Sequence, residues 1–334
     1  MAKLKDVARL SGVTPGTASR VLRNEGYVGD ETRSRVEEAA RALGYRPNPL
    51  AQSLKTRRTD FIALIVPNIL NEIFAAIAQG VEDTARKNGV TVILCNTEND
   101  LEVEKKCIAE LKSRWIDGFI VASMTQESDH IRALRNDGFP VVLTSRHYGD
   151  ELDAVVVDNF AASREAVRHL VRTGHKNIAL AMGREDFSIH RDRKNGYLAA
   201  LEENGIPARG ELIVRETFGS DSLYYAFCGL LRRGVPFDAV FAVSDYRAYV
   251  VMRALRDAGL SVPEDVSVLG FDNIDTAPLF DVPLSTVSQP LHRMGVHATN
   301  MLLERIEHKA RTGALPPPVI DVMPTELVIR KSTR

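Results

Sequence analysis

From residue 60 onward, short apolar runs rich in β-branched residues alternate with longer stretches of helical periodicity. Such runs are typical of buried parallel strands, which helices cover on both faces. The predicted strands of a first series are 61–66, 90–95, 118–122, 140–144 and 154–158. Those of a second series are 177–181, 211–217, 239–243 and 266–271. Two such series predict an α/β body with two doubly wound parallel-sheet lobes, whose ligands bind beyond the carboxyl ends of the strands.

Residues 4–43 have a different pattern, that of short helices. A first helix is predicted from an apolar stripe at helical spacing: Leu4, Val7, Ala8 and Leu10. Gly12 follows as a left-handed stop, and Thr14 can cap a second helix that has Pro15 at its first position. A tight glycine-containing turn between two short helices predicts a helix-turn-helix. A three-helix bundle without a DNA role would have the same pattern.

The remaining core of this helical head is expected to be small and apolar. The second helix is predicted to contribute Val13, Ala18, Val21 and Leu22. A third helix is expected over 30–43, with Gly44 as its stop. Its buried face is predicted to consist of Val36, Ala39, Ala40 and Leu43.

Three segments of the head resemble one family: DVARLSGVTPGTASRVL, the pattern YV-x-x-ETR-x-RV, and LGYRPNPLAQSLKTRRT. They are similar to the head of the LacI/GalR family of bacterial transcription regulators, and the resemblance continues to the last residues, LVIRKSTR. It implies an all-α helix-turn-helix head and a body like a periplasmic sugar-binding protein.

The resemblance also implies the domain boundaries. The expected parts are a DNA-binding head 1–46, a hinge helix with linker 47–60, and an effector-binding and dimerisation body 61–334. The chain would cross between lobes near 159–161, 288–291 and 322–325. Lobe one would then comprise 61–160 and 291–322, and lobe two 161–290 and 323–334.

Charge and cysteine content narrow the class of protein. Residues 1–60 carry 12 Lys and Arg against 7 Asp and Glu, whereas the rest carries 31 against 37. A basic head on an acidic body fits binding to a polyanion at one end. Three scattered cysteines, Cys95, Cys107 and Cys228, fit neither a disulfide framework nor a zinc site, so no cofactor or metal is expected. Without a signal peptide or a long apolar run, we expect a cytoplasmic, nucleoid-associated protein.

The second helix of a helix-turn-helix lies in the major groove. Its predicted base-facing residues are Pro15, Gly16 and Arg20. Arg20 can bind guanine in a bidentate manner, worth about 1–3 kcal/mol of discrimination, or it can contact a phosphate. Residues that suit phosphates are Thr14, Thr17, Ser19 and Arg23, although Ser19 and Arg23 could simply be solvated.

The segment RPNPLAQSLK resembles the hinge helix of the family. A helix of roughly seven residues is far below the ~12–15 that are marginally stable alone, so it should form only with support. The resemblance implies that a partner's hinge and the minor groove give this support, with Leu54 wedged into a base step. Ala51 would allow close approach, and Asn48 and Lys55 would touch the DNA backbone. The alternative is a linker helix with Leu54 packed on the body.

The resemblance implies an effector site at the strand ends of the body. Its predicted residues are Ile73, Phe74, Arg146, Asp158, His190, Arg193, Phe218, Ser244, Asp272 and Gln289. Arg193 in RKNGY and Asp272 in GFDN match family motifs whose arginine and aspartate hold effector hydroxyls. Three residues have structural alternatives: Asp158 as a helix cap, Phe74 as a core residue and Gln289 as a hinge residue.

The basic or titratable groups near this site leave the charge of the ligand open. They are His147, Arg184, His190 and Arg191, which would suit an anionic sugar derivative or would be solvated loop charges. Ser244 replaces the asparagine that many relatives have, so the ligand need not be an ordinary hexose.

The leading hypothesis is a sequence-specific transcription regulator, a repressor that binds a palindromic operator as a dimer and is controlled by a small sugar-like effector in the interlobe cleft. An enzyme is disfavoured, because GxxxxGK[ST], HExxH, GxSxG and a GxGxxG after a strand are absent from the sequence. A sugar-binding protein without a DNA role is the third hypothesis. Dimer or tetramer, and inducer or corepressor, stay open.

Overall fold

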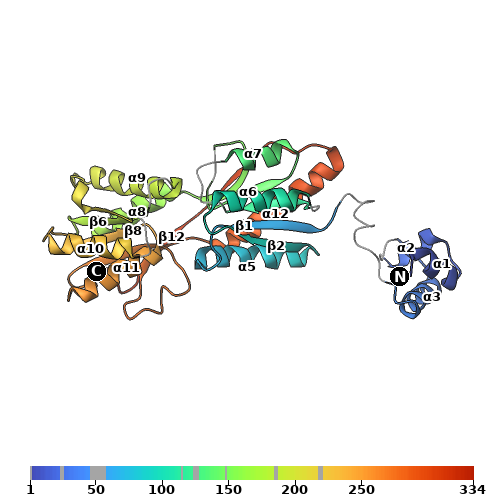
Figure 1. Ribbon diagram of the computed structural model, residues 1–334. Coiled ribbons are helices and arrows are strands. Elements are labelled where there is room, and N and C mark those ends of the chain that lie inside the picture. The colour runs from blue at the N-terminus through green and yellow to red at the C-terminus, as the bar shows by residue number, and fades with distance from the viewer. Residues whose placement is uncertain are drawn as a thin grey trace. The chain divides into compact units, whose positions relative to one another are not determined.

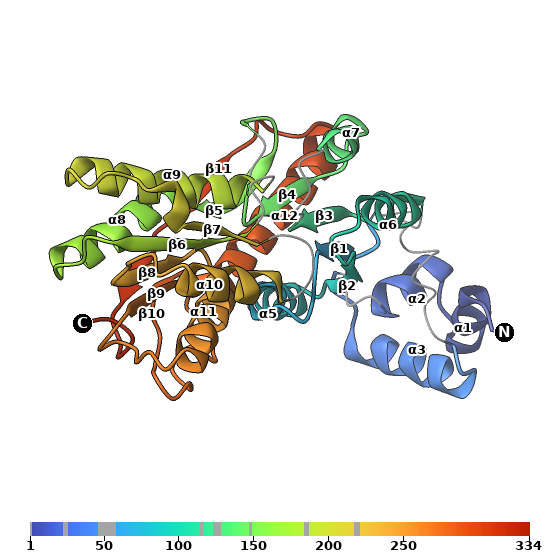
Figure 2. The same ribbon diagram turned by 60° about the vertical axis from the view of Figure 1, so that its left-hand side comes forward.

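The computed structural model describes residues 2–22, 26–45, 58–113, 116–122, 128–146, 149–183, 187–216 and 221–334. The chain divides into two compact units, Met1–Thr59 and Asp60–Arg334. The first unit is helical, and the second has helices packed against sheets (Figures 1 and 2). The predicted fold class, a small all-α head and an α/β body of two lobes, is confirmed.

The described part of the first unit has three helices, α1 (Leu4–Ser11), α2 (Pro15–Leu22) and α3 (Asp30–Ala42). They share a core of small apolar side chains: Val7, Ala8, Ala18, Val21, Val36, Ala39 and Ala40. Gly12 has a φ of 67° after α1 and Gly44 a φ of 59° after α3, so both predicted helix stops adopt the left-handed conformation.

Two predicted core residues of the head are wrong. Leu10 is 58% exposed and Leu43 is 37% exposed. Ser11 takes the place expected for Leu10, because only position 11 continues the i, i+3, i+4, i+7 series that starts at Leu4. The hydroxyl of Ser11 donates to the carbonyl oxygen of Val7 at 2.7 Å, which satisfies it inside the core. Leu43 lies beyond the last turn of α3, where the helical face no longer applies.

In the part of the second unit that the structure describes, the strands form two six-stranded sheets. The first has the order β11-β5-β4-β3-β1-β2, with parallel pairs throughout. Its strands are β1 (Phe61–Val66), β2 (Thr91–Asn96), β3 (Gly118–Val121), β4 (Val141–Thr144), β5 (Asp153–Val157) and β11 (Ile320–Met323). Together with the helices α5 (Glu72–Lys87), α6 (Leu101–Ser113), α7 (Asp129–Asn136) and α12 (Leu291–Thr312), this sheet is called lobe one.

The second sheet has the order β12-β10-β9-β8-β6-β7, and β12 runs antiparallel to β10. Its strands are β6 (Ile178–Met182), β7 (Ile213–Arg215), β8 (Ala239–Ala242), β9 (Ser267–Asp272), β10 (Ser285–Ser288) and β12 (Glu326–Val328). Together with a 3₁₀ turn (Gly210–Leu212) and the helices α8 (Asn159–Arg172), α9 (Ser188–Glu203), α10 (Ser222–Arg232) and α11 (Asp245–Asp257), this sheet is called lobe two.

Helices cover both faces of each sheet. In lobe two, α8 and α9 pack on one face and α10 and α11 on the other (Figures 1 and 2). In lobe one, Ile62 and Leu64 of β1 join the core under α5 and α12, whereas Ala63 and Ile65 join the core under α6 and α7. The chain order of the strands reverses between β1 and β3 and again between β6 and β8, and ligands of doubly wound sheets bind beside such switch points.

Three connections join the lobes within the described residues, from β5 into α8, from β10 into α12 and from β11 into β12. Lobe one therefore takes α12 and β11 from a part of the chain that follows the parallel strands of lobe two. Periodicity in the sequence does not predict β10, β11 or β12, because each is only three or four residues long and contains polar side chains.

α5 and α12 approach each other so closely that both need glycine at the contact. A Cβ atom at Gly80 would lie 2.0 Å from the carbonyl oxygen of His292. One at Gly295 would lie 2.2 Å from the carbonyl oxygen of Ile77. Backbone oxygens cannot rotate away as a side chain can. The two glycines therefore allow α12 to pack closely against α5.

We expect Gly295→Ala to lower the free energy of unfolding by about 1–3 kcal/mol, the usual range for overpacking. Gly229→Ala in α10 is the matched control, because its Cβ would meet the Arg233 guanidinium at an ordinary 3.6 Å. The control should raise stability by about 0.5–1 kcal/mol, since alanine is the better helix former. Urea unfolding measures both, and equal effects would contradict the close contact.

Candidate functional site

α2 has one buried face and one face open to solvent. Thr14 caps the helix, because its hydroxyl oxygen accepts a hydrogen bond from the Thr17 amide at 3.1 Å. Ala18 and Val21 on the inner face are buried. The three residues predicted to face bases, Pro15, Gly16 and Arg20, are exposed. The outer face of α2 is therefore accessible to a groove of DNA.

Several predicted site residues lie outside the described residues. They are Arg23, the hinge residues Asn48, Ala51, Leu54 and Lys55, the effector residue Phe218, and the basic residues His147 and Arg184. Their roles stay predictions from the sequence.

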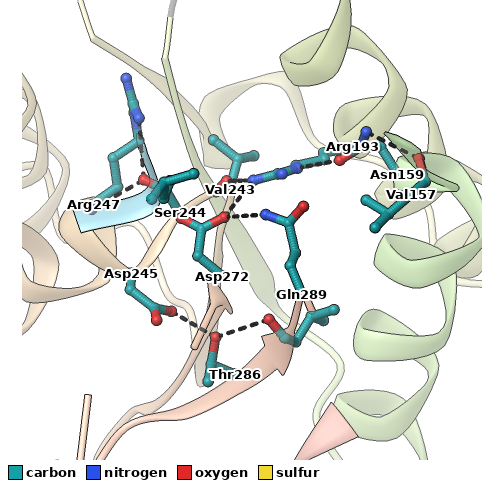
Figure 3. Close-up of polar contacts among 12 residues, drawn as sticks. Val157, Asn159, Arg193, Val243, Ser244, Asp245, Arg247, Asp272, Thr286 and Gln289 are labelled. Carbon is teal, nitrogen blue, oxygen red and sulfur yellow. Dashed lines mark hydrogen bonds and ion pairs between the residues drawn. The ribbon is translucent and has the colours of Figure 1, made fainter. Parts of the chain in front are cut away.

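The second candidate site is a buried polar cluster at the carboxyl ends of the lobe-two strands (Figure 3). Asp272, the last residue of β9, is 1% exposed. Its Oδ1 accepts a hydrogen bond from Nε2 of Gln289 at 2.8 Å and lies 3.3 Å from Nη1 of Arg193. Arg193 and Gln289 thus meet at the Asp272 carboxylate, and Arg193 and Asp272 come from two different predicted motifs.

Arg193 of α9 is fixed by several partners. Its Nε donates to Oδ1 of Asn159 at 2.8 Å, and its Nη1 donates to the carbonyl oxygen of Val243. Its guanidinium lies over the ring of Phe271, 3.5 Å from the ring centroid. Asn159 could not be predicted from the sequence, because its only signal is that a polar residue follows the end of a strand rich in β-branched residues.

Burial controls the charges of this pair. It raises the pKa of Asp272 to about 7, although the positive charge of Arg193 acts in the opposite direction. The nearby charge of Asp245 raises this pKa further. Burial also lowers the pKa of Arg193. A carboxylate has about four acceptor sites and a guanidinium five donors, so the pair can bind ligand hydroxyls as well as each other.

The backbone after β9 is strained. Asp272 has a φ of 128° and Asn273 a φ of 58°, values that non-glycine residues rarely adopt. Hydrogen bonds hold the turn in place: Asn273 Oδ1 accepts from Arg330 at 2.6 Å, and its Nδ2 donates to Ser288 at 3.1 Å. The backbone amide of Gln289 also donates to the carbonyl oxygen of Asp272 at 3.2 Å. Such strain often marks a functional site, and here it sets the direction of the Asp272 carboxylate.

Asp245, the first residue of α11, also holds the turn after β9 in place. It is completely buried, its Oδ2 accepts from the amide of Ile274 at 3.0 Å, and its Oδ1 accepts from the hydroxyl of Thr286 at 2.6 Å. Gly270 makes room for it, since a Cβ atom there would lie 2.3 Å from Oδ1 of Asp245. The glycine of the GFDN motif therefore makes room for the carboxylate of Asp245, a residue that the motifs in the sequence do not mark as part of the site.

A second ion pair belongs to the same strand ends. Arg247 in the first turn of α11 binds Glu216, which follows β7. Its Nη1 also donates to the hydroxyl of Ser244 at 3.1 Å (Figure 3). Ser244 also caps α11. Arg247 and the His190 ring both contact the backbone of Gly183 after β6 closely. A Cβ atom at Gly183 would lie 2.4 Å from Nη2 of Arg247 and 2.3 Å from the His190 ring.

The structure places two predicted residues of lobe one in or against its core. Phe74 is 5% exposed and belongs to the cluster under α5 and α12, and Ile73 packs against that cluster. Arg146 is buried just beyond β4. The alternative of Phe74 as a core residue fits these contacts, and its role toward an effector stays a prediction.

Two predicted residues of lobe two have structural partners. Asp158 is exposed and caps α8, because its Oδ1 accepts from the amide of Ala161 at 2.8 Å. His190 is buried, with its ring edge-to-face against Phe187 at a centroid distance of 5.5 Å. The cap is the alternative expected for Asp158.

Other kinds of site find little support in the described ranges. There, no group of three His, Cys, Asp or Glu side chains is arranged to hold a metal ion. Cys95, Cys107 and Cys228 are free thiols, each partly buried. None of the described helices combines the length and apolar character needed to span a membrane.

Comparison with known proteins agrees with this architecture. Residues 3–48 match the family of bacterial regulatory proteins, lacI family, and residues 59–315 match periplasmic binding proteins and the sugar binding domain of the LacI family. The HTH-type transcriptional repressor PurR of Actinobacillus pleuropneumoniae serotype 3 (strain JL03) is 34% identical, over 100% of this chain and 99% of its own length.

Two solved structures are similar over nearly the whole chain. A complex of the transcriptional regulator CelR with cellobiose has a TM-score of 0.74 at 32% identity, and covers 99% of this chain and 100% of that one. The lac repressor dimer bound to operator has a TM-score of 0.86 at 25% identity, with 99% of each chain covered.

Together, the helix-turn-helix head and the two-lobed body define a DNA-binding transcriptional regulator that carries a sugar-binding type of domain. The chain belongs to the LacI family of bacterial regulatory proteins. Because the family and the similar proteins are transcriptional regulators, the protein is not an enzyme.

Asp272 should make stability depend on pH. Its pKa rises from the ordinary 3.8 to about 7, so between these values the folded protein holds a proton that the unfolded chain has released. The stabilisation is complete below pH ~4 and is lost as the pH rises through ~7. The stability of the wild type relative to Asp272→Asn should therefore fall across this window, by at most about 1.4 kcal/mol per pH unit.

Urea unfolding of both proteins at pH about 5 and about 8 measures this difference. Asp257→Asn, at an exposed aspartate of α11, is the control for the substitution itself. A difference between wild type and Asp272→Asn that does not change with pH would contradict the raised pKa of Asp272.

Proposed function

We propose that this protein is a repressor that binds a palindromic operator as a homodimer and responds to a neutral, sugar-like effector held between its lobes. The observation that carries the proposal is the two-sided α2, with Ala18 and Val21 buried and Arg20 exposed, in a chain of the LacI family. Such a protein acts on chromosomal DNA, so we place it in the cytoplasm with the nucleoid.

Symmetry supports the homodimer. One reader helix per subunit requires two half-sites related by a two-fold axis, hence a near-palindromic operator. A groove of about 730 Å³ on lobe two has exposed Tyr246 and Phe280 on its walls, with Arg253 and Asp281 beside them. A surface with aromatic rings and both signs of charge suits contact with a second copy of itself, and the similar lac repressor chain was solved as a dimer on its operator.

The hinge segment completes the proposed DNA-binding mode. By resemblance, Leu54 would wedge into the minor groove at the centre of the operator, which costs a few kcal/mol of unstacking and is cheapest at a pyrimidine–purine step. Asn48 and Lys55 would contact the DNA backbone, and Ala51 would let the two hinge helices approach. The coupling free energy between effector binding and DNA binding in such a protein is typically about 1–3 kcal/mol.

Selection from random duplex DNA should return an inverted repeat. Against the selected site, Arg20→Ala should weaken binding about 5- to 150-fold for each half-site and relax the preference at one base pair per half-site, because one bidentate guanine contact is worth about 1–3 kcal/mol. Arg41→Ala, at the end of α3, is the matched control and should bind as the wild type does.

The same titrations distinguish the alternative role of Arg20. A phosphate contact would weaken binding to all sequences equally and reduce the salt slope by about one. A single asymmetric half-site from the selection would contradict the homodimer.

The charges in lobe two favour a neutral ligand. Arg193 has Asp272 as its ion-pair partner, and Arg247 has Glu216. When Asp272 is ionised, each guanidinium has its own carboxylate, so the described cluster offers paired donors and acceptors and little excess positive charge. Sugar hydroxyls both donate and accept, so they match such a set. The similar regulator CelR was solved with the neutral disaccharide cellobiose.

Thermal unfolding of the protein with a panel of sugars tests this proposal. We expect the neutral mono- and disaccharides, including cellobiose, to raise the melting temperature of the protein more than anionic sugars do. Gluconate and glucose 6-phosphate are their anionic counterparts. For the best ligand, Asp272→Asn should weaken binding about 10- to 100-fold, as expected for loss of a charged hydrogen bond, with operator affinity retained. Asp257→Asn controls for the substitution. An anionic compound as the best ligand, or unchanged affinity in a folded Asp272→Asn, would contradict the proposed site.

A further inference from the structure

Lobe one and lobe two are also joined by a side-chain contact away from their chain connections. Glu72 is the first residue of α5 in lobe one, and Thr276 lies between β9 and β10 of lobe two. The Thr276 hydroxyl donates to Oε1 of Glu72 at 2.9 Å, and the Thr276 amide donates to Oε2 at 3.3 Å. Both residues are half-buried, and they are 204 positions apart in the sequence. One carboxylate thus binds two donors across the lobes.

On the lobe-two side, this contact is connected to Asp272 by a short and firmly held turn. Only three residues separate Asp272 from Thr276, and the turn 272–276 contains the two strained φ angles, those of Asp272 and Asn273. Asp245 holds the amide of Ile274 in the middle of the turn. Ala277 at its end is completely buried, and its amide donates to the carbonyl oxygen of Ile274 at 2.9 Å. A segment anchored at so many points moves as a unit.

On the lobe-one side, the contact ends on an equally rigid element. Glu72 follows Asn71, whose side chain caps α5 by accepting from the amide of Ile73 at 3.2 Å. α5 in turn is seated on α12 at the contact between Gly80 and Gly295. A change in the position of Thr276 must therefore either move lobe one or break the contact with Glu72.

We propose that the Glu72–Thr276 contact is an interlobe latch, and that the turn 272–276 couples this latch to the Asp272 carboxylate. When Asp272 changes its hydrogen-bond partners, the strained turn shifts between discrete arrangements and changes the strength of the latch. The lobe angle then changes because the two arrangements bind the ligand with different affinity. The inference rests on the proposed function for the role of Asp272 as an effector contact, whereas the latch itself requires neither DNA nor effector.

Single-molecule energy transfer on the full chain can test the latch. Dyes are coupled to azide-bearing residues at positions 106 and 202, exposed sites on α6 of lobe one and α9 of lobe two. The labelled chain is mixed with excess unlabelled chain so that each assembly carries one labelled copy. Glu72→Ala should raise the ratio of open to closed molecules about three- to tenfold, because the contact is charged but only half-buried.

Thr276→Val is the second variant, which removes the hydroxyl and keeps the amide, so it should shift the ratio in the same direction by less. Glu102→Ala is the matched control. It removes an exposed first-turn glutamate from α6, and its partner Lys105 lies in the same lobe, so it controls for the charge at a helix N-terminus. The control should leave the ratio as in the wild type. If Glu72→Ala and Thr276→Val are folded by circular dichroism and leave the ratio unchanged, the latch is refuted.

A double-mutant cycle tests the coupling. The effect of Thr276→Val on the ratio should change at least threefold when Asp272→Asn is also present, because coupled residues are not additive. Paired instead with Asp321→Asn, at a lobe-one aspartate that binds His297, Thr276→Val should keep its effect. Additive effects of Thr276→Val and Asp272→Asn would overturn the coupling. These measurements use neither DNA nor sugar. Their outcome can therefore be interpreted even if the operator-binding or effector-binding experiments contradict the proposed function.

Discussion

The end of β9 depends on one buried carboxylate. Asp245 lies completely inside lobe two and binds both the backbone at Ile274 and the hydroxyl of Thr286 on the neighbouring strand. Burial raises the pKa of Asp245, while these hydrogen bonds lower it. A buried polar group is tolerated only when its partners are in place, so Asp245 ties the strained turn, the sheet and the first turn of α11 into one arrangement. The direction of Asp272 follows from that arrangement.

The candidate effector site is assembled by topology more than by local sequence. Its side chains come from α9, α11 and the ends of several strands, which meet only because parallel strands present their carboxyl ends on one edge. Hydrogen bonds then give each charged group a defined partner. This pairing keeps the cluster stable without a ligand, and it means that a ligand must exchange contacts with groups that are already bonded. Sensitivity to ligand shape is the expected result, because an ill-fitting ligand would leave buried groups unpaired.

Much of the fold could be predicted from the sequence, for physical reasons. The apolar runs that become β1, β3 and β4 are buried on both faces, and this leaves a clear mark on their composition. β10 and β12 could not be predicted, because they are short, partly polar strands whose pairing is set by distant segments. In the head, the apolar stripe predicts Leu10 in the core, but the buried face continues at Ser11 and Leu10 is exposed.

The candidate effector site, like the fold, could be predicted from the sequence only in part. The motifs around Arg193 and Asp272 identified two members of the cluster, and the structure adds partners that no motif contains. Asn159 and Glu216 could not be found from the sequence, because a polar residue after a strand is as often a solvated loop residue as a partner in a buried network. Gly270 was visible as part of a motif, but its reason, the space for Asp245, exists only in three dimensions.

The interleaving of the lobes has a consequence for synthesis of the chain. The core of lobe one requires Met294, Ala298 and Leu302 from α12, and its sheet requires β11, all of which leave the ribosome after β6 to β10. The main core of lobe two comes from one continuous stretch and can form earlier. Contacts between distant segments form slowly, because the intervening chain must first close a large loop. During translation, the sheet formed by β1 to β5 therefore lacks α12 until late, and apolar surface left exposed in this way favours aggregation of the nascent chain.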